Sequence, residues 1–311
     1  MSLDVICIGN LNIDVTAYID HIPDLDESIY ASNLTISPGG SAANTAVGIS
    51  RLGLKSGFIG RVGADPYSQL LIKSLIDEGV DTSHIVVDNT GNTGFVIVLV
   101  DRSGVRRIIR WPGVNLNLSP LDIDEEYIRK AKAIHASGVK TNIAYSIANL
   151  CDRYKLTFCW DPGLIAVMEE LNNLAETLSK TSILFISEAE SKILTRTSSI
   201  NEAILKILDV GVKIVAVKAG VKGSYIAFNN NIHYIPAVKV KPVIDTTGAG
   251  DTYAAAFIVQ TLKGKNPIQS AKYASVASAL KVRLSGAQNI PRREEIEKFI
   301  RNNYNILQIN Y

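Results

Sequence analysis

Cysteine and histidine are too sparse in this sequence to indicate a disulfide framework or a metal centre. There are three cysteines, Cys7, Cys151 and Cys159, an odd number without metal-type spacing and in apolar or mixed surroundings. Cysteines of this kind are typical of small core residues in a reducing compartment. The four histidines are scattered and show no ligand spacing. Neither residue type therefore predicts a functional site.

An excess of charge of one sign and a long apolar run are also missing. The 311 residues carry a formal net charge of +2, which gives no basis for binding nucleic acid or an anionic membrane surface. No apolar stretch approaches the ~20 residues that a membrane span needs, and the N-terminal segment lacks the basic region of a signal peptide. Hydrophobic residues make up 47% of the chain, enough for a large core. We predict a soluble, cytoplasmic protein.

Short apolar runs alternate with amphipathic stretches along most of the chain. The runs are typical of strands that are buried on both faces of a parallel sheet, and they are Val5–Ile8, Ala133–Ala136, Thr157–Trp160, Ile183–Ile186 and Lys213–Val217. Helical patterns occur at Ala42–Leu52, Tyr67–Asp77, Ile143–Tyr154, Glu202–Leu208, Asp251–Leu262, Ile268–Leu284 and Arg293–Asn302. The alternation predicts an α/β sandwich with right-handed crossovers.

Two stretches without a helical pattern interrupt this order, at Thr16–Ile36 and Thr93–Arg110. In the second, two strand-like runs flank the turn Asp101–Gly104 and predict a β-hairpin. We expect a small sheet, formed by about 14–38 and 91–112, that covers a site at the strand ends as a lid. Because no repeat or linker divides the chain, residues 1–311 are predicted to form a single domain that carries this lid.

The strongest local motif is Asp245-Thr-Thr-Gly-Ala-Gly-Asp251, which precedes a helical run. Gly248, Ala249 and Gly250 allow backbone N–H groups to approach a ligand, and a helix N-terminus favours negative charge. The motif predicts an anion hole for a transferring phosphoryl group. Asp251 lies in the first turn, where it can accept the proton of an attacking hydroxyl. The alternative is a tight turn with an acidic residue that the helix dipole favours.

Several segments resemble, in the same order, the ribokinase-like (PfkB) family of carbohydrate and nucleoside kinases. DTTGAGDTYAAAF resembles the C-terminal signature of that family, and PGGSAANTAVGISRLG resembles its N-terminal signature. The segments 60–82, 112–120 and 285–299 are similar to further parts of its members. The resemblance implies a ribokinase-like three-layer α/β/α sandwich with a small β-sheet lid. It also implies that the γ-phosphoryl group of ATP is transferred to a primary hydroxyl of a sugar or nucleoside.

The resemblance implies substrate-binding residues near the first strand and at the start of the first long helix. They are Asn12, Asp14, Gly39, Gly40, Ser41 and Asn44, together with the catalytic base Asp251. An ionised carboxylate only accepts hydrogen bonds, so Asp14 suits a pair of substrate hydroxyls. The structural alternatives are a turn after the strand for the first two residues, and a glycine turn with a polar helix residue for the others.

Nucleotide-binding residues are implied in the same way. They are Ser187, Glu190, Lys218, Gly220, Gly223, Gly248 and Gly250, with ATP along the loop Lys218–Ser224. Glu190 matches a residue that helps to place Mg²⁺ through water, whereas Ser187 stands where the family usually has Asn. Ser-x-x-Glu is also a capping box, so a purely structural role stays open for this pair, as does a plain turn for the loop.

A third ligand implied by the resemblance is a monovalent cation, K⁺, behind the anion hole. Asp245 and Thr247, with backbone groups near Gly286, match the region where many members hold it. Lys281 and Leu284 depart from the ribokinase pattern at this place. ATP, Mg²⁺ and K⁺ are therefore the predicted cofactors.

The acceptor is less well defined by the sequence. Ribokinases usually carry Lys after the glycine pair and Glu after the strand that matches Ala133–Ala136, but this chain has Ser41 and the segment HASGVKTN. These departures argue against free ribose and favour a nucleoside, with ribokinase or another free-sugar kinase as the alternative.

Two further classes of protein are alternatives to a kinase. A catalytically inactive sugar or nucleoside sensor would be expected to lose the base or the glycines, and this chain keeps them. A nucleotide-binding oxidoreductase would need G-x-G-x-x-G after the first strand, where the chain has GNLNID. The apolar alternation of Phe95–Val100 is compatible with a homodimer formed through the lid.

Overall fold

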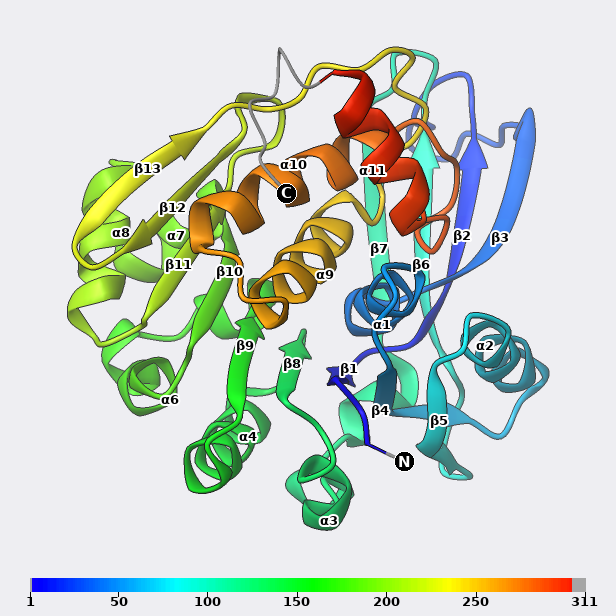
Figure 1. Cartoon of the computed structure of the whole chain (residues 1–311). Coiled ribbons are helices and arrows are strands. Elements are labelled where there is room, and N and C mark those ends of the chain that lie inside the picture. The colour runs from blue at the N-terminus through cyan, green and yellow to red at the C-terminus, as the bar shows by residue number, and fades with distance from the viewer. Residues whose placement is uncertain (1, 304–311) are drawn as a thin grey trace.

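The computed structural model describes residues 2–303, which form one large sheet and one small sheet (Figure 1). The large sheet has the strand order β13-β12-β11-β10-β9-β8-β1-β4-β5. From β11 to β5 the strands are parallel, and β12 and β13 form an antiparallel edge. The strands are β1 (Val5–Gly9), β4 (Ser56–Gly63), β5 (Asp81–Asp88), β8 (Ala133–Ser137), β9 (Thr157–Asp161), β10 (Ile183–Ser187), β11 (Ile214–Lys218), β12 (Ser224–Phe228) and β13 (Asn231–Ile235).

Helices cover both faces of this sheet, because its central strands are apolar at consecutive positions. In β1, Val5 and Cys7 pack in one hydrophobic cluster, and Ile6 and Ile8 pack in the other. The first cluster includes side chains of α1 (Ser41–Arg51), α2 (Pro66–Asp77), α9 (Ala249–Leu262), α10 (Pro267–Lys281) and α11 (Arg293–Asn302). The second includes side chains of α3 (Glu125–Ile128), α4 (Thr141–Tyr154), α5 (Gly163–Val167), α6 (Ala175–Ser179), α7 (Glu188–Thr195) and α8 (Ile200–Asp209). The predicted α/β sandwich is confirmed.

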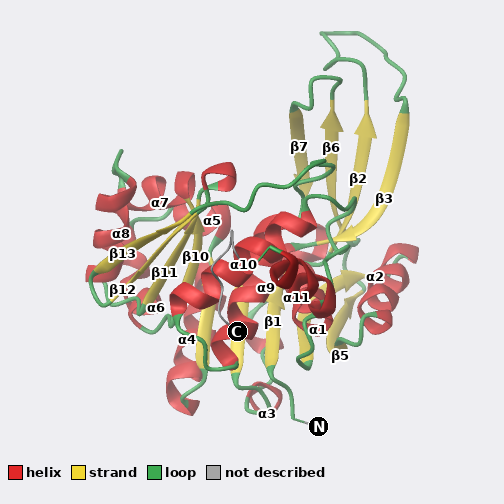
Figure 2. Cartoon of the chain, turned by 45° about the horizontal axis from the view of Figure 1, so that its top comes forward, coloured by secondary structure: helices red, strands yellow, loops and turns green. Residues whose placement is uncertain are grey.

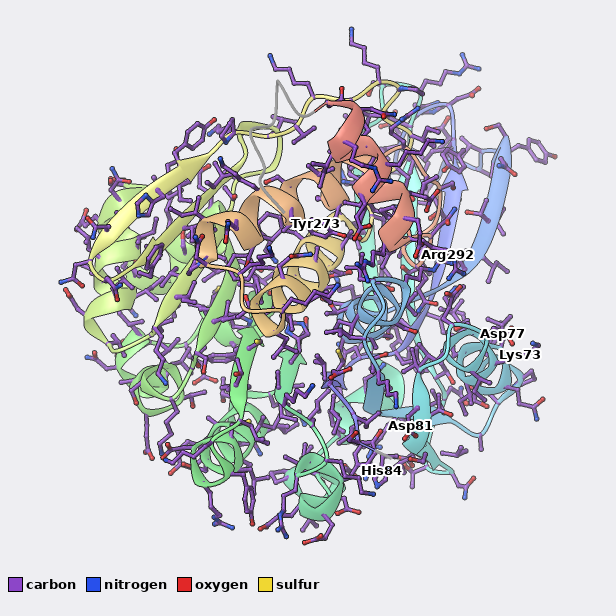
Figure 3. The ribbon with its side chains drawn as sticks, in the orientation of Figure 1. Lys73, Asp77, Asp81, His84, Tyr273 and Arg292 are labelled. Atoms are coloured by element: carbon purple, nitrogen blue, oxygen red, sulfur yellow. The ribbon has the colours of Figure 1, made fainter. Side chains whose placement is uncertain are left out.

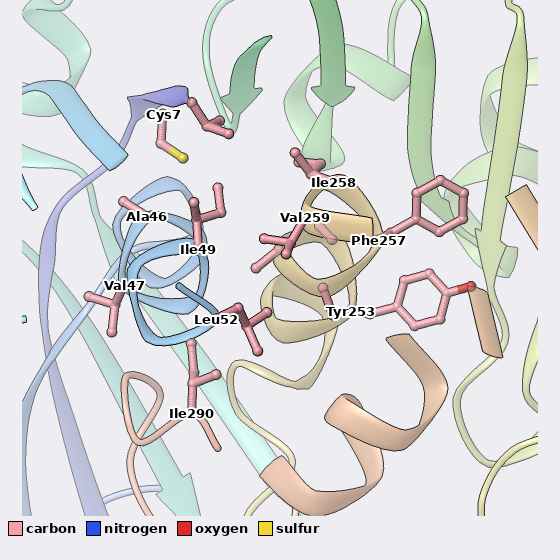
Figure 4. Packing of buried hydrophobic residues seen from close by; sticks show 14 of the residues in the cluster. Cys7, Ala46, Val47, Ile49, Leu52, Tyr253, Phe257, Ile258, Val259 and Ile290 are labelled. Atoms are coloured by element: carbon pink, nitrogen blue, oxygen red, sulfur yellow. The ribbon is translucent and has the colours of Figure 1, made fainter. Parts of the chain in front are cut away.

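Helices α1 and α9 pack directly against each other in the first cluster (Figure 4). The two helices approach so closely that a Cβ on Gly48 would collide with the Cβ of Ala255. Ile49 and Val259 extend the same apolar contact. Since α1 and α9 each begin at a glycine-rich motif, this packing fixes the two motifs relative to each other.

The small sheet stands away from the large one (Figure 2). Its strand order is β3-β2-β6-β7, with β2 (Asn12–Tyr18), β3 (Asn33–Gly39), β6 (Gly94–Val100) and β7 (Arg106–Trp111). Strands β6 and β7 form the expected hairpin, and Asp101 accepts hydrogen bonds from the backbone of its turn. Strands β6 and β7 fall within the expected lid segment 91–112, whereas β2 begins two residues before the expected segment 14–38 and β3 ends one residue after it.

Charged side chains lie mainly on the outside of the helices. Lys73 and Asp77, labelled in Figure 3, form an exposed ion pair of 2.7 Å on α2. Such a pair contributes little to stability. Between residues 2 and 303, no helix is long and apolar enough to span a membrane.

Four strands and several short elements were not predicted from the sequence. Strand β4 contains three glycines, and β5, β12 and β13 mix polar with apolar residues. Helix α10 ends at Lys281 rather than at Leu284, because Arg283 and Leu284 continue in turns. The remaining short helices are η1 (Gly113–Asn117), η2 (Pro120–Asp122), η3 (Leu171–Leu174) and η4 (Gly220–Lys222).

Candidate active site

The glycine motif at the start of α9 forms a tight turn that exposes backbone N–H groups. Gly248 is the N-cap of the helix and has a φ of 77°, in the left-handed region that favours glycine. A Cβ at this position would also collide with the carbonyl oxygen of Ala287. Ala249 and Gly250 occupy the first helical positions. The turn therefore has the geometry of an anion site at a helix N-terminus.

Asp251 lies in the first turn of α9, and its carboxylate is held by two residues of α1. Ser41 Oγ donates to Oδ1 at 2.6 Å, and Asn44 Nδ2 donates to Oδ2 at 2.7 Å. Ser137, at the end of β8, donates in turn to Ser41 Oγ at 2.7 Å. Burial raises the pKa of Asp251, while the hydrogen bonds from Ser41 and Asn44 oppose the rise. The carboxylate is thus oriented and made more basic, as a general base requires.

The small sheet contributes Asp14 from β2. Burial raises the pKa of Asp14 to about 7, the charge of Asp251 adds to the rise, and Arg110 opposes it. Asp14 and Arg110 both lie opposite Val96 in the sheet register, so their side chains share one face of the sheet. A Cβ on Gly39 would collide with the Asp14 carboxylate, so a larger residue at that position would displace it.

Asn12 is tied to the segment that follows the hairpin. Its Oδ1 accepts a hydrogen bond of 2.8 Å from Asn115 Nδ2, and Asn115 Oδ1 accepts one from the backbone N–H of Leu11. Asn115 is buried. It therefore joins η1 to the base of β2 and limits the positions that Asn12 can take.

Gly40 precedes α1 with a φ of 102°, and a Cβ there would collide with the carbonyl oxygen of Asn10. Only glycine fits this approach without strain. The turn places Ser41 at the start of the helix, within reach of Asp251.

A cavity of about 740 Å³ lies next to the glycine turn, whose residues Ala249 and Gly250 line it. Most of its lining is apolar, and the charged lining residues are Lys218, Lys239 and Lys241. The apolar part includes Val221, Val238, Val240, Val243, Ala279 and Val282. Lys218, Gly220, Gly223, Ala249 and Gly250 also line it. A mostly apolar cavity with a few polar groups is typical of a small-molecule site.

Lys218 lines this cavity beside the glycine turn. Its Nζ donates to Asp161 Oδ2 at 2.6 Å, and both side chains are largely buried. Burial alone lowers the pKa of Lys218, but Asp161, with smaller contributions from Asp251 and Glu190, raises it overall. A Cβ on Gly250 would lie 3.6 Å from Nζ. The ammonium is therefore charged and next to the glycine turn.

The remaining residues expected at a nucleotide site are near β10 and β11. Gly220 and Gly223 have φ values of 58° and 109°, and they form the ends of η4. Ser187 and Glu190 form a complete capping box at the start of α7, since each side chain accepts a hydrogen bond from the backbone of the other. The capping interpretation is correct for the structure, and it leaves one carboxylate oxygen of Glu190 without a role in the cap.

The region expected to hold K⁺ contains a positive side chain. Asp245 Oδ1 accepts from Thr247 N, and Oδ2 accepts from Gly286 N. Lys281 is fully buried in the same region, and its charge lowers the pKa of Asp245 together with the hydrogen bonds from Thr247 and Gly286, against the larger single effect of burial on this carboxyl. Because a buried ammonium repels a second cation in a site removed from water, the residues present do not fit the predicted K⁺.

Sequence reasoning missed four polar residues that the structure brings to these sites. Ser137 and Asp161 each end a strand, where polar residues at the carboxyl edge of a parallel sheet often bind ligands. Arg110 and Asn115 are placed by the register of the small sheet and by η1, for which the sequence held no signal.

A basic aspartate beside a helix N-terminal anion site, with a cavity and a buried lysine next to it, defines the class of a phosphotransferase. The comparisons with known proteins agree with this class. The profile described as pfkB family carbohydrate kinase matches residues 2–294. The chain belongs to this family, and it is an enzyme that phosphorylates a sugar-type hydroxyl.

Relatives extend over nearly the whole chain. An ATP-dependent ribose-1-phosphate kinase of Halopiger xanaduensis is 30% identical over 95% of this chain and 97% of its own length. The structure of Arabidopsis thaliana ribokinase complexed with ribose and ATP is 28% identical, with a TM-score of 0.86 and coverage of 96% and 99%. A putative ribokinase II from E. coli, in complex with ATP and Mg²⁺, is 26% identical, with a TM-score of 0.84 and coverage of 96% and 99%. The ribokinase-like fold is thereby confirmed.

Proposed function

We propose that this chain is an ATP- and Mg²⁺-dependent kinase that phosphorylates the primary hydroxyl of a furanose-containing acceptor, with Asp251 as the base. One observation carries the proposal. The Asp251 carboxylate, held by Ser41 and Asn44, sits in the first turn of a helix that begins with the anion-site glycines. The base and the anion site are therefore built into a single helix start, the arrangement that in-line phosphoryl transfer needs.

In this mechanism the acceptor hydroxyl lies between the Asp251 carboxylate and the γ-phosphorus of ATP. Asp251 takes the proton as the oxygen attacks, and the bond from the γ-phosphorus to the bridging oxygen of ADP breaks. The N–H groups of Gly248, Ala249 and Gly250 donate hydrogen bonds to the oxygens of the transferring group and so stabilise its negative charge. The raised pKa of Asp251 favours proton transfer near neutral pH.

ATP fits the cavity beside the glycine turn. Its apolar lining suits a purine ring, and Lys218 lies at the end where the phosphates would meet α9. In this arrangement Gly220 and Gly223 give the backbone room to approach the nucleotide. We assign Mg²⁺ to the phosphates, with Glu190 contacting it through water, because Mg²⁺ retains several waters and needs few protein ligands.

The acceptor side favours a sugar whose anomeric position carries a substituent, and we propose a nucleoside. Ser41 and Ser137 are short hydroxyl residues, hydrogen-bonded to each other and to Asp251. They stand where a free-ribose kinase is expected to have longer charged side chains. Asp14 and Asn12 remain to accept and donate hydrogen bonds to ring hydroxyls.

A second acceptor is favoured by Arg110. Its side chain shares a sheet face with Asp14, with strand β6 between them, and guanidinium groups bind phosphate in a bidentate manner. A pentose 1-phosphate would satisfy this positive charge. The ribose-1-phosphate kinase of Halopiger xanaduensis, a relative at 30% identity, acts on such a substrate by its name.

The lid and a dimer are further parts of the proposal. We propose a single domain in which the segments 14–38 and 91–112 close over the acceptor. The face of the small sheet opposite Asp14 carries a continuous apolar row, which comprises Ile36, Val15, Ile97 and Ile109. Ile36 and Ile109 are 53% and 58% exposed in the single chain. Exposed apolar patches mark interfaces, so a second copy would cover this row in a homodimer.

We assign the reaction to the cytoplasm. That compartment supplies ATP and keeps thiols reduced, and Cys7, Cys151 and Cys159 are all free and buried.

The test is ADP formation from ATP·Mg²⁺ with nucleosides, ribose 1-phosphate, free pentoses and hexoses, each with wild type and Arg110→Ala. Turnover with nucleosides that survives Arg110→Ala supports the first acceptor. Turnover with ribose 1-phosphate whose KM rises in Arg110→Ala supports the second. ATP binding without turnover on any member would contradict the proposal and favour a sensor.

A further inference from the structure

A lysine side chain is buried behind the glycine turn. Lys281 is the last residue of α10 and is 0% exposed. Its Nζ donates a hydrogen bond of 3.1 Å to the carbonyl oxygen of Leu284. A lysine at a helix C-terminus is favoured by the helix dipole, but such residues normally extend to water. Complete burial of an ammonium group is costly unless negative groups compensate for it.

Two carboxylates provide part of that compensation. Burial lowers the pKa of Lys281, and the charges of Asp245 and Asp251 raise it in opposition. Lys281 in turn lowers the pKa of Asp245, in addition to the effects of the hydrogen bonds that Asp245 accepts from Thr247 and Gly286. The ammonium thus contacts the carbonyl oxygen of Leu284 and interacts with the charges of Asp245 and Asp251 without forming an ion pair with either.

The segment around Lys281 is bound to the anion site by backbone contacts. The carbonyl oxygen of Val282 accepts hydrogen bonds from Ile244 N at 2.7 Å and from Asp245 N at 3.1 Å. Ser278 Oγ donates to the carbonyl oxygen of Ala249 at 2.9 Å. The end of α10 therefore contacts the glycine turn on both sides of Gly248.

The loop after α10 completes this support. Gly248 packs so closely on Ala287 that no Cβ fits between them. Asp245 Oδ2 accepts a hydrogen bond from Gly286 N at 3.0 Å. Lys281 Nζ donates a hydrogen bond to the carbonyl oxygen of Leu284, two residues before Gly286. A shift of the loop at 284–287 would therefore move the N–H groups that receive the phosphoryl group.

We propose that the Lys281 ammonium is a built-in replacement for a monovalent cation, a positioning residue that holds the 284–287 loop and Asp245 behind the anion site. A free monovalent cation at this place would need oxygen ligands such as the Leu284 carbonyl, which already accepts a hydrogen bond from the ammonium. A second positive charge beside the ammonium would be repelled in a site removed from water. The kinase therefore works without K⁺.

This inference rests on the proposed function for its kinetic arm, in which kcat and KM are measured in K⁺ and in tetramethylammonium at equal ionic strength. Wild type should show the same kcat in both salts, within about twofold. Lys281→Ala removes the charge and opens space, so its kcat should fall on the order of tenfold to a hundredfold in tetramethylammonium and recover in K⁺. Lys281→Met fills the space without charge, so its kcat should fall and not recover.

Lys263→Met is the matched control, because Lys263 is an exposed lysine at the C-cap of the neighbouring helix α9. It should behave as wild type in both salts. The change in Lys281→Met should appear mainly in kcat, with the acceptor KM altered less, since the residue does not contact the acceptor. A merely structural lysine would give no recovery of kcat by K⁺ in Lys281→Ala.

Thermal unfolding provides an arm that does not depend on any acceptor. The melting temperature of wild type should be the same in K⁺ and in tetramethylammonium, and that of Lys281→Ala should rise in K⁺. A wild-type kcat or melting temperature that increases strongly with K⁺ would overturn the inference, as would a Lys281→Met variant with normal kcat. If no acceptor is phosphorylated, the proposed function fails, and the melting temperatures still decide the role of Lys281.

Discussion

Asp14 is expected to destabilise the free protein at neutral pH, and replacing it by Asn should reveal how much. Its pKa is raised to about 7, mainly by burial and next by Asp251. The native state therefore binds the proton more tightly than the unfolded state does. The stability gained in this way is complete below the unfolded pKa near 3.9 and is lost as the pH rises through 7.

The magnitude follows from the shift. Between pH 5 and pH 8 about two pKa units are crossed, which correspond to about 3 kcal/mol. Partial exposure of the site reduces this to about 1–2 kcal/mol. Asp14→Asn cannot ionise, so its free energy of unfolding relative to wild type should increase by that amount between the two pH values.

Urea unfolding of wild type and Asp14→Asn at pH 5 and pH 8, without acceptor, measures the difference. Asp24→Asn, on the exposed connection between β2 and β3, is the control for a simple change of charge. An equal stability difference at both pH values would refute the reasoning. In kinetics, kcat/KM for the acceptor in wild type should rise with pH through about 7, because only ionised Asp14 accepts two hydroxyl hydrogen bonds.

Three other substitutions test separate parts of the site. Gly248→Ala places a Cβ against the Ala287 carbonyl at a positive φ, so it should lower the free energy of unfolding by about 1–3 kcal/mol and kcat at least tenfold, as measured by urea unfolding and initial rates. Lys218→Met leaves Asp161 buried without its partner, which should cost about 3–5 kcal/mol and weaken ATP binding in calorimetry; unchanged ATP affinity would contradict the assignment. Ser187→Ala removes a helix cap and should lower the free energy of unfolding by about 1 kcal/mol, as measured by thermal unfolding. An altered Mg²⁺ dependence of kcat in this variant would show that Ser187 also acts at the metal.

The sequence predicted those parts of the site whose residues are neighbours in the chain. The turn from Asp245 to Asp251 could be predicted as an anion site from neighbouring residues alone, because three small residues and an acidic residue begin one helix. The parallel strands were predictable for a related reason, since strands buried on both faces are continuously apolar. Strand β4 escaped prediction because three of its eight residues are glycine.

Contacts between distant segments could not be predicted in this way. Lys218 and Asp161 are 57 residues apart and meet only because β9 and β11 flank β10 in the sheet. Ser137 reaches Ser41 across 96 residues. The fit of K⁺ could not be judged from the sequence, because the sequence does not show whether the Lys281 side chain is buried or exposed. In the structure it is buried.

The central claim is that Asp251 is the base of a phosphoryl transfer from ATP, and one comparison tests it most directly. ADP formation is measured for wild type and Asp251→Asn with the best acceptor, together with calorimetric binding of that acceptor. The account predicts that Asp251→Asn binds the acceptor and loses a factor of about 10²–10⁴ in kcat. Near-normal kcat in Asp251→Asn would contradict it.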